Sequence, residues 1–371
     1  MTRLRYVGSD EGGSNLAYVN ARVRARRAAL LDEADYRKLI RMGPNEIARF
    51  LEETEYEREV NALGARHSGV DLVEYALNEN LSRHFRDMLD WADGHLYEQI
   101  ARYLRKFDAW NIKTALRGIY TDSERAEIEN DLIRAGELSD AQLNAMLDAA
   151  NVEAVIEASS GTMFHDALVE AFDAFEETNL LFPLENAIDR VFFENLISGV
   201  AVDAGPAARV LGGQRLSTGS PTDIYHEFLI AEIDFVNVRN ALRIARSGAE
   251  MDTADYLIEG GRLFDAAELA RLVRNMDDLV AVIRESRYGD RLSDALNALE
   301  EAESMLEVER AIDVALVEYG DWLGSRHPVS VCPVVSYILA KELEVRNIRA
   351  IARGREAGLS EEEIREELVM P

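Results

Sequence analysis

The amino-acid sequence predicts an almost wholly α-helical fold, and three observations support this prediction. Only 7 of the 371 residues are proline. Alanine, leucine, glutamate and arginine dominate the composition, and these residues favour helix over strand. No run alternates apolar and polar residues for long enough to predict a sheet. Because 47% of the residues are hydrophobic, we expect the helices to enclose a sizeable core.

One eleven-residue pattern, which we call motif A, occurs three times. It reads FDAWNIKTALR at residues 107–117, IDFVNVRNALR at 233–243 and LEVRNIRAIAR at 343–353. A five-residue pattern, motif B, precedes each copy and reads Glu-x-Ala-(Leu or Ile)-(Asn or Asp) at residues 74–78, 185–189 and 309–313. The period is too long for common solenoids, whose units run about 20 to 50 residues. The pattern predicts a triplicated helical domain.

We therefore expect three similar helical-bundle repeats. They cover residues 1–122 with an N-terminal extension, residues 123–249, and residues 250–371. A stretch rich in Gly, Ser and Pro near residues 198–222 is predicted to be a loop inserted in the second repeat. This insert accounts for the longer spacing between motif B and motif A in that repeat.

The segments between these motifs also carry helix signals. The segment after motif A recurs as LIRAGELSDAQL from Leu132 and as LIEGGRLFDAAEL from Leu257. Ser139 with Gln142 and Ser360 with Glu363 have the spacing of capping boxes. Pro221 after Ser220 predicts a helix that begins directly after the insert. The connecting segments are thus predicted to be helical as well.

On a helix, the acid and the asparagine of motif A lie on the same face as its apolar residues. A buried polar group without a hydrogen bond costs about 1–3 kcal/mol, so each acid and asparagine needs a partner. We expect each pair to tie its helix to a loop or helix end within its own repeat, rather than to form a ligand site. The cations of motif A, four residues apart, are predicted to face outward. The predicted ties are Asp108, Asn111, Asp234, Asn237, Glu344 and Asn347.

The charge balance is strongly acidic, with 69 acidic and 41 basic residues and a formal net charge of -28. Such a surface repels nucleic acid and anionic lipid at ordinary ionic strength. Only four of the basic residues are lysine. An acidic, lysine-poor composition is typical of a cytosol with molar salt, where the Debye length is about 3 Å. We expect a halophilic source, and loss of the fold in low salt would support this expectation.

The sequence predicts a soluble, cytoplasmic protein. Cys332 is the single cysteine, which excludes an internal disulfide and fits a reducing compartment. The first residues contain no apolar core of signal-peptide length. The longest apolar run, residues 329–340, is shorter than the roughly 18 residues of a membrane span and contains Pro333.

Patterns that would carry chemistry are missing from the sequence. None of the six histidines has a glutamate three residues before it, so a Glu-x-x-His metal site is not predicted. Asp223 and His226 have the nearest metal-ligand spacing, but a structural role is favoured. Asp277 and Asp278 fit the first turn of a helix. The glycines of the insert do not form a phosphate-binding loop. We expect no catalytic residue, no metal and no cofactor.

One local feature has the opposite charge to the rest of the protein. Residues 18–27, YVNARVRARR, contain four arginines and no acid. We favour a solvated helix whose arginines pair with carboxylates elsewhere. The alternative is a docking edge for an acidic partner. The four residues are Arg22, Arg24, Arg26 and Arg27.

The chain resembles the family of C subunits of archaeal and bacterial A/V-type rotary ATPases, whose eukaryotic V-ATPase counterparts are the d subunits. The resemblance covers nearly the whole length and is carried by five stretches. They are YVNARVRARRAALL from Tyr18, YRKLI from Tyr36, FDAWNIKTALRG from Phe107, EIDFVNVRNALR from Glu232 and the segment at residues 342–368. Two departures occur in the third motif A, where Glu344 replaces an aspartate and Arg346 replaces a tryptophan.

The resemblance implies a three-domain helical funnel with pseudo-threefold symmetry and no catalytic residue. It also implies a place in a proton-translocating ATP synthase, on the inner face of the membrane. The wide face would sit on the membrane rotor ring of c- or K-type subunits, and the other end would hold the D- and F-type shaft subunits. The alternatives from the residues alone are a helical scaffold for soluble partners and, less favoured, an acid-base hydrolase.

Overall fold

The computed structural model describes residues 15–203, 220–247, 256–301 and 305–368. Within these ranges the chain forms nineteen α-helices and no β-strand, which confirms the all-α prediction. None of these helices is long and apolar enough to cross a membrane. Gly205, Gly212 and Gly213, for which the sequence predicts no phosphate-binding loop, and most of the predicted insert lie outside the described residues.

The helices follow a recurring order of three or four shorter helices and then a long one that carries motif B. The next long helix, or a broken pair of helices, carries motif A. The first set is α1 (Leu16–Arg27), α2 (Glu33–Leu39), α3 (Pro44–Leu51), α4 (Glu57–Leu63), α5 (Gly69–Trp91), α6 (His95–Leu104) and α7 (Lys106–Tyr120). The second is α8 (Arg125–Asn130), α9 (Asp140–Leu147), α10 (Val152–Ala158), α11 (His165–Thr178), α12 (Phe182–Asp203) and α13 (Pro221–Ser247). The third is α14 (Ala266–Leu272), α15 (Met276–Glu285), α16 (Ser293–Glu301), α17 (Met305–Arg326), α18 (Cys332–Glu356) and α19 (Glu361–Glu367).

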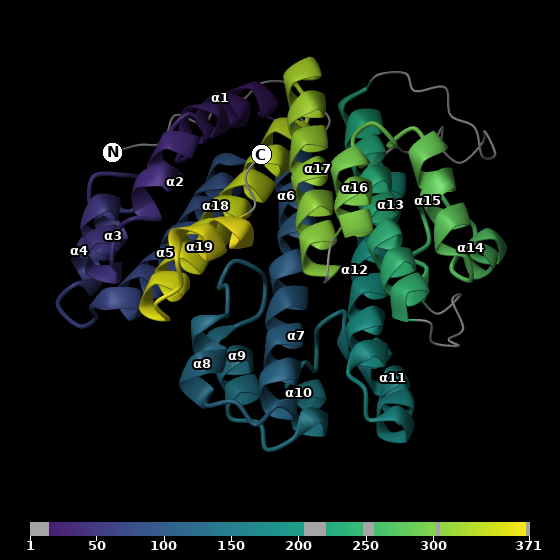
Figure 1. Cartoon of the computed structure of the whole chain (residues 1–371), viewed down its shortest axis with the longest axis horizontal. Helices are drawn as coiled ribbons and strands as arrows, with labels where there is room; N and C mark the ends of the chain where they lie inside the picture. The colour runs from purple at the N-terminus through teal and green to yellow at the C-terminus, as the bar shows by residue number, and fades with distance from the viewer. Residues whose placement is uncertain (1–14, 204–219, 248–255, 302–304, 369–371) are drawn as a thin grey trace.

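The short helices pack between two long helices that come from different parts of the chain. α9 and α10 contact α7, and α10 also contacts α11, which packs on α12. α15 contacts α13, and α16 packs on α17. α2 and α3 contact α18 from the far end of the chain, while α3 and α4 pack on α5. In Figure 1 the N-terminal helices α1–α5 accordingly lie beside the C-terminal helices α18 and α19.

Local sequence explains where many helices begin. Ser139 caps α9 and Ser360 caps α19 in capping boxes, as predicted, and Asp32 caps α2 in the same way. Ser220 accepts a hydrogen bond from the Asp223 amide in the first turn of α13. Asp277 and Asp278 occupy the first turn of α15, where carboxylates are favoured by the helix dipole.

One hydrophobic core runs through nearly the whole chain, from Val19 on α1 to Leu368 after α19. Cys332 is fully buried in this core, and burial raises the pKa of its thiol to about 12. A small second cluster, Ile128, Leu132, Leu143 and Leu147, joins α8 to α9. The long helices are therefore held in one continuous packed body.

Candidate functional site: the motif A helices and their ties

The acid and the asparagine of the first motif A bind the backbone of the segment that follows α8. Asp108 accepts hydrogen bonds from the amides of Glu137 and Leu138 at 2.8 and 2.9 Å. Asn111 donates to the carbonyl of Ile133 and accepts from its amide, both at 2.8 Å. Asp108 and Asn111 are almost fully buried. Their side chains thus satisfy four backbone groups of an irregular segment.

A glycine permits this close approach. A Cβ atom on Gly136 would lie 2.1 Å from Oδ1 of Asp108, and one on Gly261 would lie 2.5 Å from Oδ1 of Asp234. Any larger residue would push the segment away from the carboxylate. The recurring Gly in LIRAGELSDAQL and LIEGGRLFDAAEL is therefore explained by the carboxylate that it faces.

The second motif A makes the same set of bonds. Asp234 accepts from the amides of Arg262 and Leu263 at 2.7 and 2.9 Å. Asn237 exchanges two hydrogen bonds with the backbone of Ile258, both at 2.9 Å. Burial raises the pKa of Asp234, and it raises the pKa of Asp108 to about 6 although two amides donate to each carboxylate.

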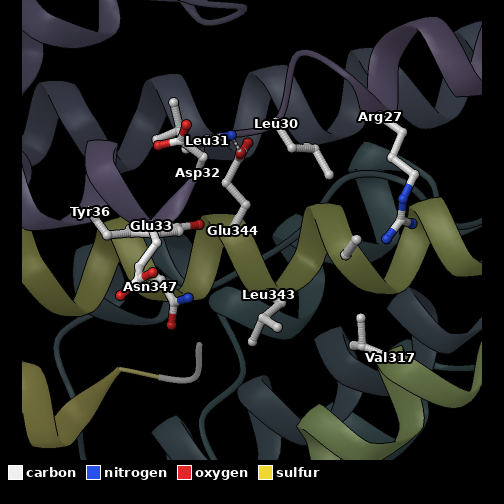
Figure 2. A pocket seen from close by; sticks show the side chains of 11 residues that line it. Arg27, Leu30, Leu31, Asp32, Glu33, Tyr36, Val317, Leu343, Glu344 and Asn347 are labelled. Carbon is white, nitrogen blue, oxygen red and sulfur yellow. Dashed lines mark hydrogen bonds between the residues drawn. The ribbon is translucent and has the colours of Figure 1, made fainter. Parts of the chain in front are cut away.

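The third motif A uses a different segment of the chain. Glu344 on α18 accepts from the amide of Leu31 at 2.6 Å, from the Tyr56 hydroxyl at 2.7 Å and from Nζ of Lys341 at 2.7 Å. Asn347 hydrogen-bonds the side chain of Tyr36. Figure 2 shows Glu344 reaching from α18 to the backbone between α1 and α2. The N-terminal segment thus takes the place that residues 133–138 and 258–263 take beside the other two motifs.

The expectation that each tie stays within its own repeat is not met. Asp108 binds residues beyond the predicted boundary at 122, and Asp234 binds residues beyond the boundary at 249. Glu344 binds the opposite end of the chain. The reason is that each motif A helix packs against the short helices of the following set, as described above.

The outward orientation predicted for the motif A cations holds for the last arginine of each copy, Arg117, Arg243 and Arg353, whose side chains are about half exposed. The prediction missed that these cations also pair with the acids of motif B. Three arginines at equivalent positions bind the glutamates of motif B on the next long helix. These ion pairs are Arg117–Glu185 from α7 to α12, Arg243–Glu309 from α13 to α17, and Arg353–Glu74 from α18 to α5. The third pair joins the two ends of the sequence.

The cation four residues earlier in motif A makes a second link. Lys113 pairs with Asp189, and Arg239 pairs with Asp313. In the third link Arg349 donates to Oδ1 of Asn78 at 2.6 Å, because motif B has an asparagine there. Arg353 makes an additional ion pair with Asp131, at 2.9 Å. Motifs A and B are thus partners across neighbouring sets of helices.

The arginines of α1 divide into two groups. Arg26 pairs with Asp87 on α5, and Arg27 pairs with Asp321 on α17, as the favoured interpretation expects. Arg22 and Arg24 are exposed, and Arg22 lies over the Trp91 ring with its Cζ 4.9 Å from the centroid. A docking edge made by these four residues stays a prediction.

A cavity of about 540 Å³ lies next to Glu344 between α1, α2, α17 and α18 (Figure 2). Its polar groups serve the fold, since Asp32 caps α2, Glu33 pairs with Arg37, and Glu344 receives the three donors described above. A second cavity, of about 290 Å³, lies at the equivalent position beside Asp108. In the part of the chain that the structure describes, no group of three or more His, Cys, Asp or Glu is placed to hold a metal ion.

Sequence reasoning missed one cluster, which lies where three motif A helices approach one another. Lys106 on α7 and Glu342 on α18 form an ion pair at 2.8 Å. Glu232 on α13 accepts a hydrogen bond from the Tyr103 hydroxyl of α6 at 3.0 Å. Each of the three charged residues stands two positions before the acid of its motif A. That shared position was the signal that could have revealed the cluster.

Comparison with known proteins gives a consistent result. The family model described as ATP synthase (C/AC39) subunit matches residues 19–367. The chain is 59% identical over 362 residues to the C subunit of the A-type ATP synthase from Haloferax volcanii, covering 98% of this chain and 99% of the relative. It is 52% identical over 362 residues to the protein of the same name from Halobacterium salinarum, with the same coverage. The corresponding protein from Methanococcoides burtonii is 33% identical over 371 residues, covering 100% of this chain and 98% of the relative.

Proposed function

We propose that this chain, which belongs to the ATP synthase (C/AC39) subunit family, is a non-catalytic rotor subunit of an A/V-type ATP synthase. In this role it couples the central shaft, made of D- and F-type subunits, to the membrane rotor ring of c- or K-type subunits. It is a peripheral protein on the cytoplasmic face of the membrane. Proton-driven ATP synthesis or hydrolysis then takes place in the other subunits of the complex.

One observation carries this proposal. Each motif A helix is fixed on two sides, by buried hydrogen bonds to an irregular segment and by ion pairs to the next motif B helix. A part that transmits torque must resist deformation, and close packing with satisfied polar networks supplies stiffness. The acids and cations of motif A are engaged in the fold rather than directed at a substrate.

The same contacts support a pseudo-threefold funnel as the arrangement of this rotor subunit. The three arginine–glutamate pairs run from the first motif A helix to the second motif B helix, from the second to the third, and from the third back to the first. A chain of links that returns to its start is the pattern expected of three units around an axis. In this proposal the three units are divided near residues 122 and 249, as the sequence predicts.

Co-purification tests the proposed role. A tagged copy of the chain, expressed in a haloarchaeal host and recovered from detergent-solubilised membranes at molar KCl, should retain the shaft and ring subunits. The matched control is the same chain with the buried tie broken by Asp234→Ala, which should recover less of both because the fold is weakened. Recovery of the tagged wild-type chain without shaft or ring subunits would favour the alternative, a helical scaffold for soluble partners.

The remaining alternative, a hydrolase that uses the acids of motif A, makes a different prediction. Asp108→Asn, Asp234→Asn and Glu344→Gln should lower the free energy of unfolding if these residues are ties. Loss of a turnover activity in variants that keep wild-type stability would instead support an enzyme.

A further inference from the structure

Glu232 occupies an unusual environment for an ionisable side chain. Glu232 is only 5% exposed. It lies on α13 at the point where α6, α7 and α18 also contribute polar side chains. Oε1 accepts a hydrogen bond from Tyr103, but Oε2 is buried and has no hydrogen-bond partner among the described residues. A buried carboxylate normally needs an ion pair or several donors.

The cations near Glu232 are bound to other carboxylates. Lys106 is the cation that acts on Glu232, but its Nζ is bound to Glu342 at 2.8 Å, and it also acts on Asp313. Glu342 adds a second negative charge on the side of α18. Asp313 on α17 is itself held between Arg239 and Arg346. Because each of these cations binds another carboxylate, Glu232 has no bound counter-charge among the described residues.

We propose that Glu232 is a proton-binding site at the junction of the three motif A helices, and that it carries a proton on Oε2 in the folded protein at neutral to mildly acidic pH. A proton is the smallest ligand that removes the uncompensated charge. It requires no extra space in a packed junction. The protonated side chain keeps the Oε1 contact with Tyr103.

The direction of the shift in pKa agrees with this geometry. Burial raises the pKa of Glu232 to about 7, while Lys106 and the Tyr103 hydroxyl act to lower it and Glu342 acts to raise it. Tyr103 stays neutral, because burial raises its pKa well above the usual value. Because the folded pKa lies above the unfolded one, the folded state binds the additional proton. The stability that Glu232 contributes should therefore fall as the pH rises from about 4.5 to about 7.

Denaturant unfolding of the full-length chain at fixed molar KCl tests the site. One group with these two pKa values raises the unfolding equilibrium constant about twentyfold between roughly pH 5.5 and 7.5. Glu232→Gln should remove this increase and leave the dependence that Asp108, Asp234 and His84 contribute, in which the lowered pKa of buried His84 acts in the opposite direction to the two aspartates. The control, Asp140→Asn, changes a carboxylate that is 83% exposed and should keep the wild-type dependence.

Two further variants separate a titrating site from a merely structural glutamate. Glu342→Gln removes a negative neighbour and should move the midpoint of proton loss to lower pH. Lys106→Met removes the positive neighbour and should move that midpoint to higher pH. Infrared spectra at pH 6 should show a protonated carboxyl band that is lost in Glu232→Gln.

Two results would overturn the proposal. In the first, Glu232→Gln keeps the full pH dependence and the wild type lacks the infrared band, so that Glu232 is ionised. In the second, the dependence follows the identity of the metal cation when Na⁺, K⁺ and choline are exchanged at equal ionic strength, so that the ligand is a metal ion. These experiments use the isolated chain, so their outcome is independent of the proposed rotor role.

Discussion

The α13–α17 junction and the α18–α5 junction use equivalent positions of motifs A and B but differ in chemistry. At α13–α17 both acids of motif B are carboxylates, Glu309 and Asp313, and each receives an arginine of motif A. At α18–α5 the last position of motif B, which is an aspartate in the other two copies, is occupied by Asn78. Its amide group donates to the carbonyl of Asn130 at 2.7 Å while its oxygen accepts from Arg349. A carboxylate cannot make the first of these bonds.

The charge that Asn78 lacks is supplied from elsewhere. Asp131, beside Asn130, pairs with Arg353. The α18–α5 junction thus includes the loop after α8 as a third partner. The comparison shows that an equivalent position can keep its place in the fold while its bonding partners change. Such a change occurs where the two ends of the chain meet.

The motif A acids of these two regions, Glu344 on α18 and Asp234 on α13, have different hydrogen-bond donors. The largest predicted effect follows from this difference. Glu344→Ala should lower the free energy of unfolding by about 3–5 kcal/mol, because it leaves the fully buried Lys341 without its counter-charge. Asp234→Ala should lower the free energy of unfolding by about 1–3 kcal/mol, because it leaves two backbone amides without an acceptor. Denaturant titration at molar KCl measures both values. Equal losses, or a smaller loss for Glu344→Ala, would contradict this assignment.

The second prediction concerns the glycine that the first two ties require. Gly136→Ala should lower the free energy of unfolding by about 1–3 kcal/mol, because the new Cβ collides with Asp108. Gly43→Ala is the matched control, since a Cβ there meets nothing closer than 3.9 Å. Thermal unfolding of the two variants gives the comparison. A Gly136→Ala protein as stable as the control would show that the segment can move away freely.

A third prediction concerns Asp313, which binds Arg239 and Arg346. Asp313→Asn should cost about 2 kcal/mol at pH 7, because two charge-assisted hydrogen bonds are weakened. Burial acts to raise the pKa of Asp313, but the two arginines hold it below its usual value. The stabilisation should therefore be complete above about pH 4 and be lost as the pH falls further. A penalty that stays constant down to pH 3 would argue against the ion pairs as its source.

The smallest predicted effect is that of Asn78→Asp, which gives the α18–α5 junction the aspartate that the other two copies of motif B have. The new carboxylate strengthens the bond to Arg349 but loses the bond to the Asn130 carbonyl. We expect the free energy of unfolding to change by less than about 1 kcal/mol. Unfolding curves of Asn78→Asp and Asp313→Asn should be compared under identical conditions. A stabilisation of several kcal/mol by Asn78→Asp would mean that Asp131 does not compensate for the asparagine.

The sequence predicted the all-α fold, the capping residues and the positions of the motif A acids and asparagines, because these depend on local periodicity and on short spacings. It did not predict their partners. Helical periodicity assigns Arg117 or Arg243 to a face, but it does not identify Glu185 or Glu309 as the group packed against that face. The N-terminal segment at Leu31 has no sequence signal that relates it to Glu344, since Ala29 stands where Gly136 and Gly261 stand in the other two segments.

Hydrogen exchange of Arg353→Ala tests the proposed cycle of three units most directly, because Arg353 makes the motif A to motif B ion pair that closes the cycle between the end of the chain and its beginning. If the three units support one another around a closed cycle, the variant should lose protection in α7, α12 and α13 as well as in α5 and α18, with a single cooperative unfolding transition. If α7, α12 and α13 keep wild-type protection while only α5 and α18 lose theirs, the units are joined as an open row, and the cyclic account is contradicted.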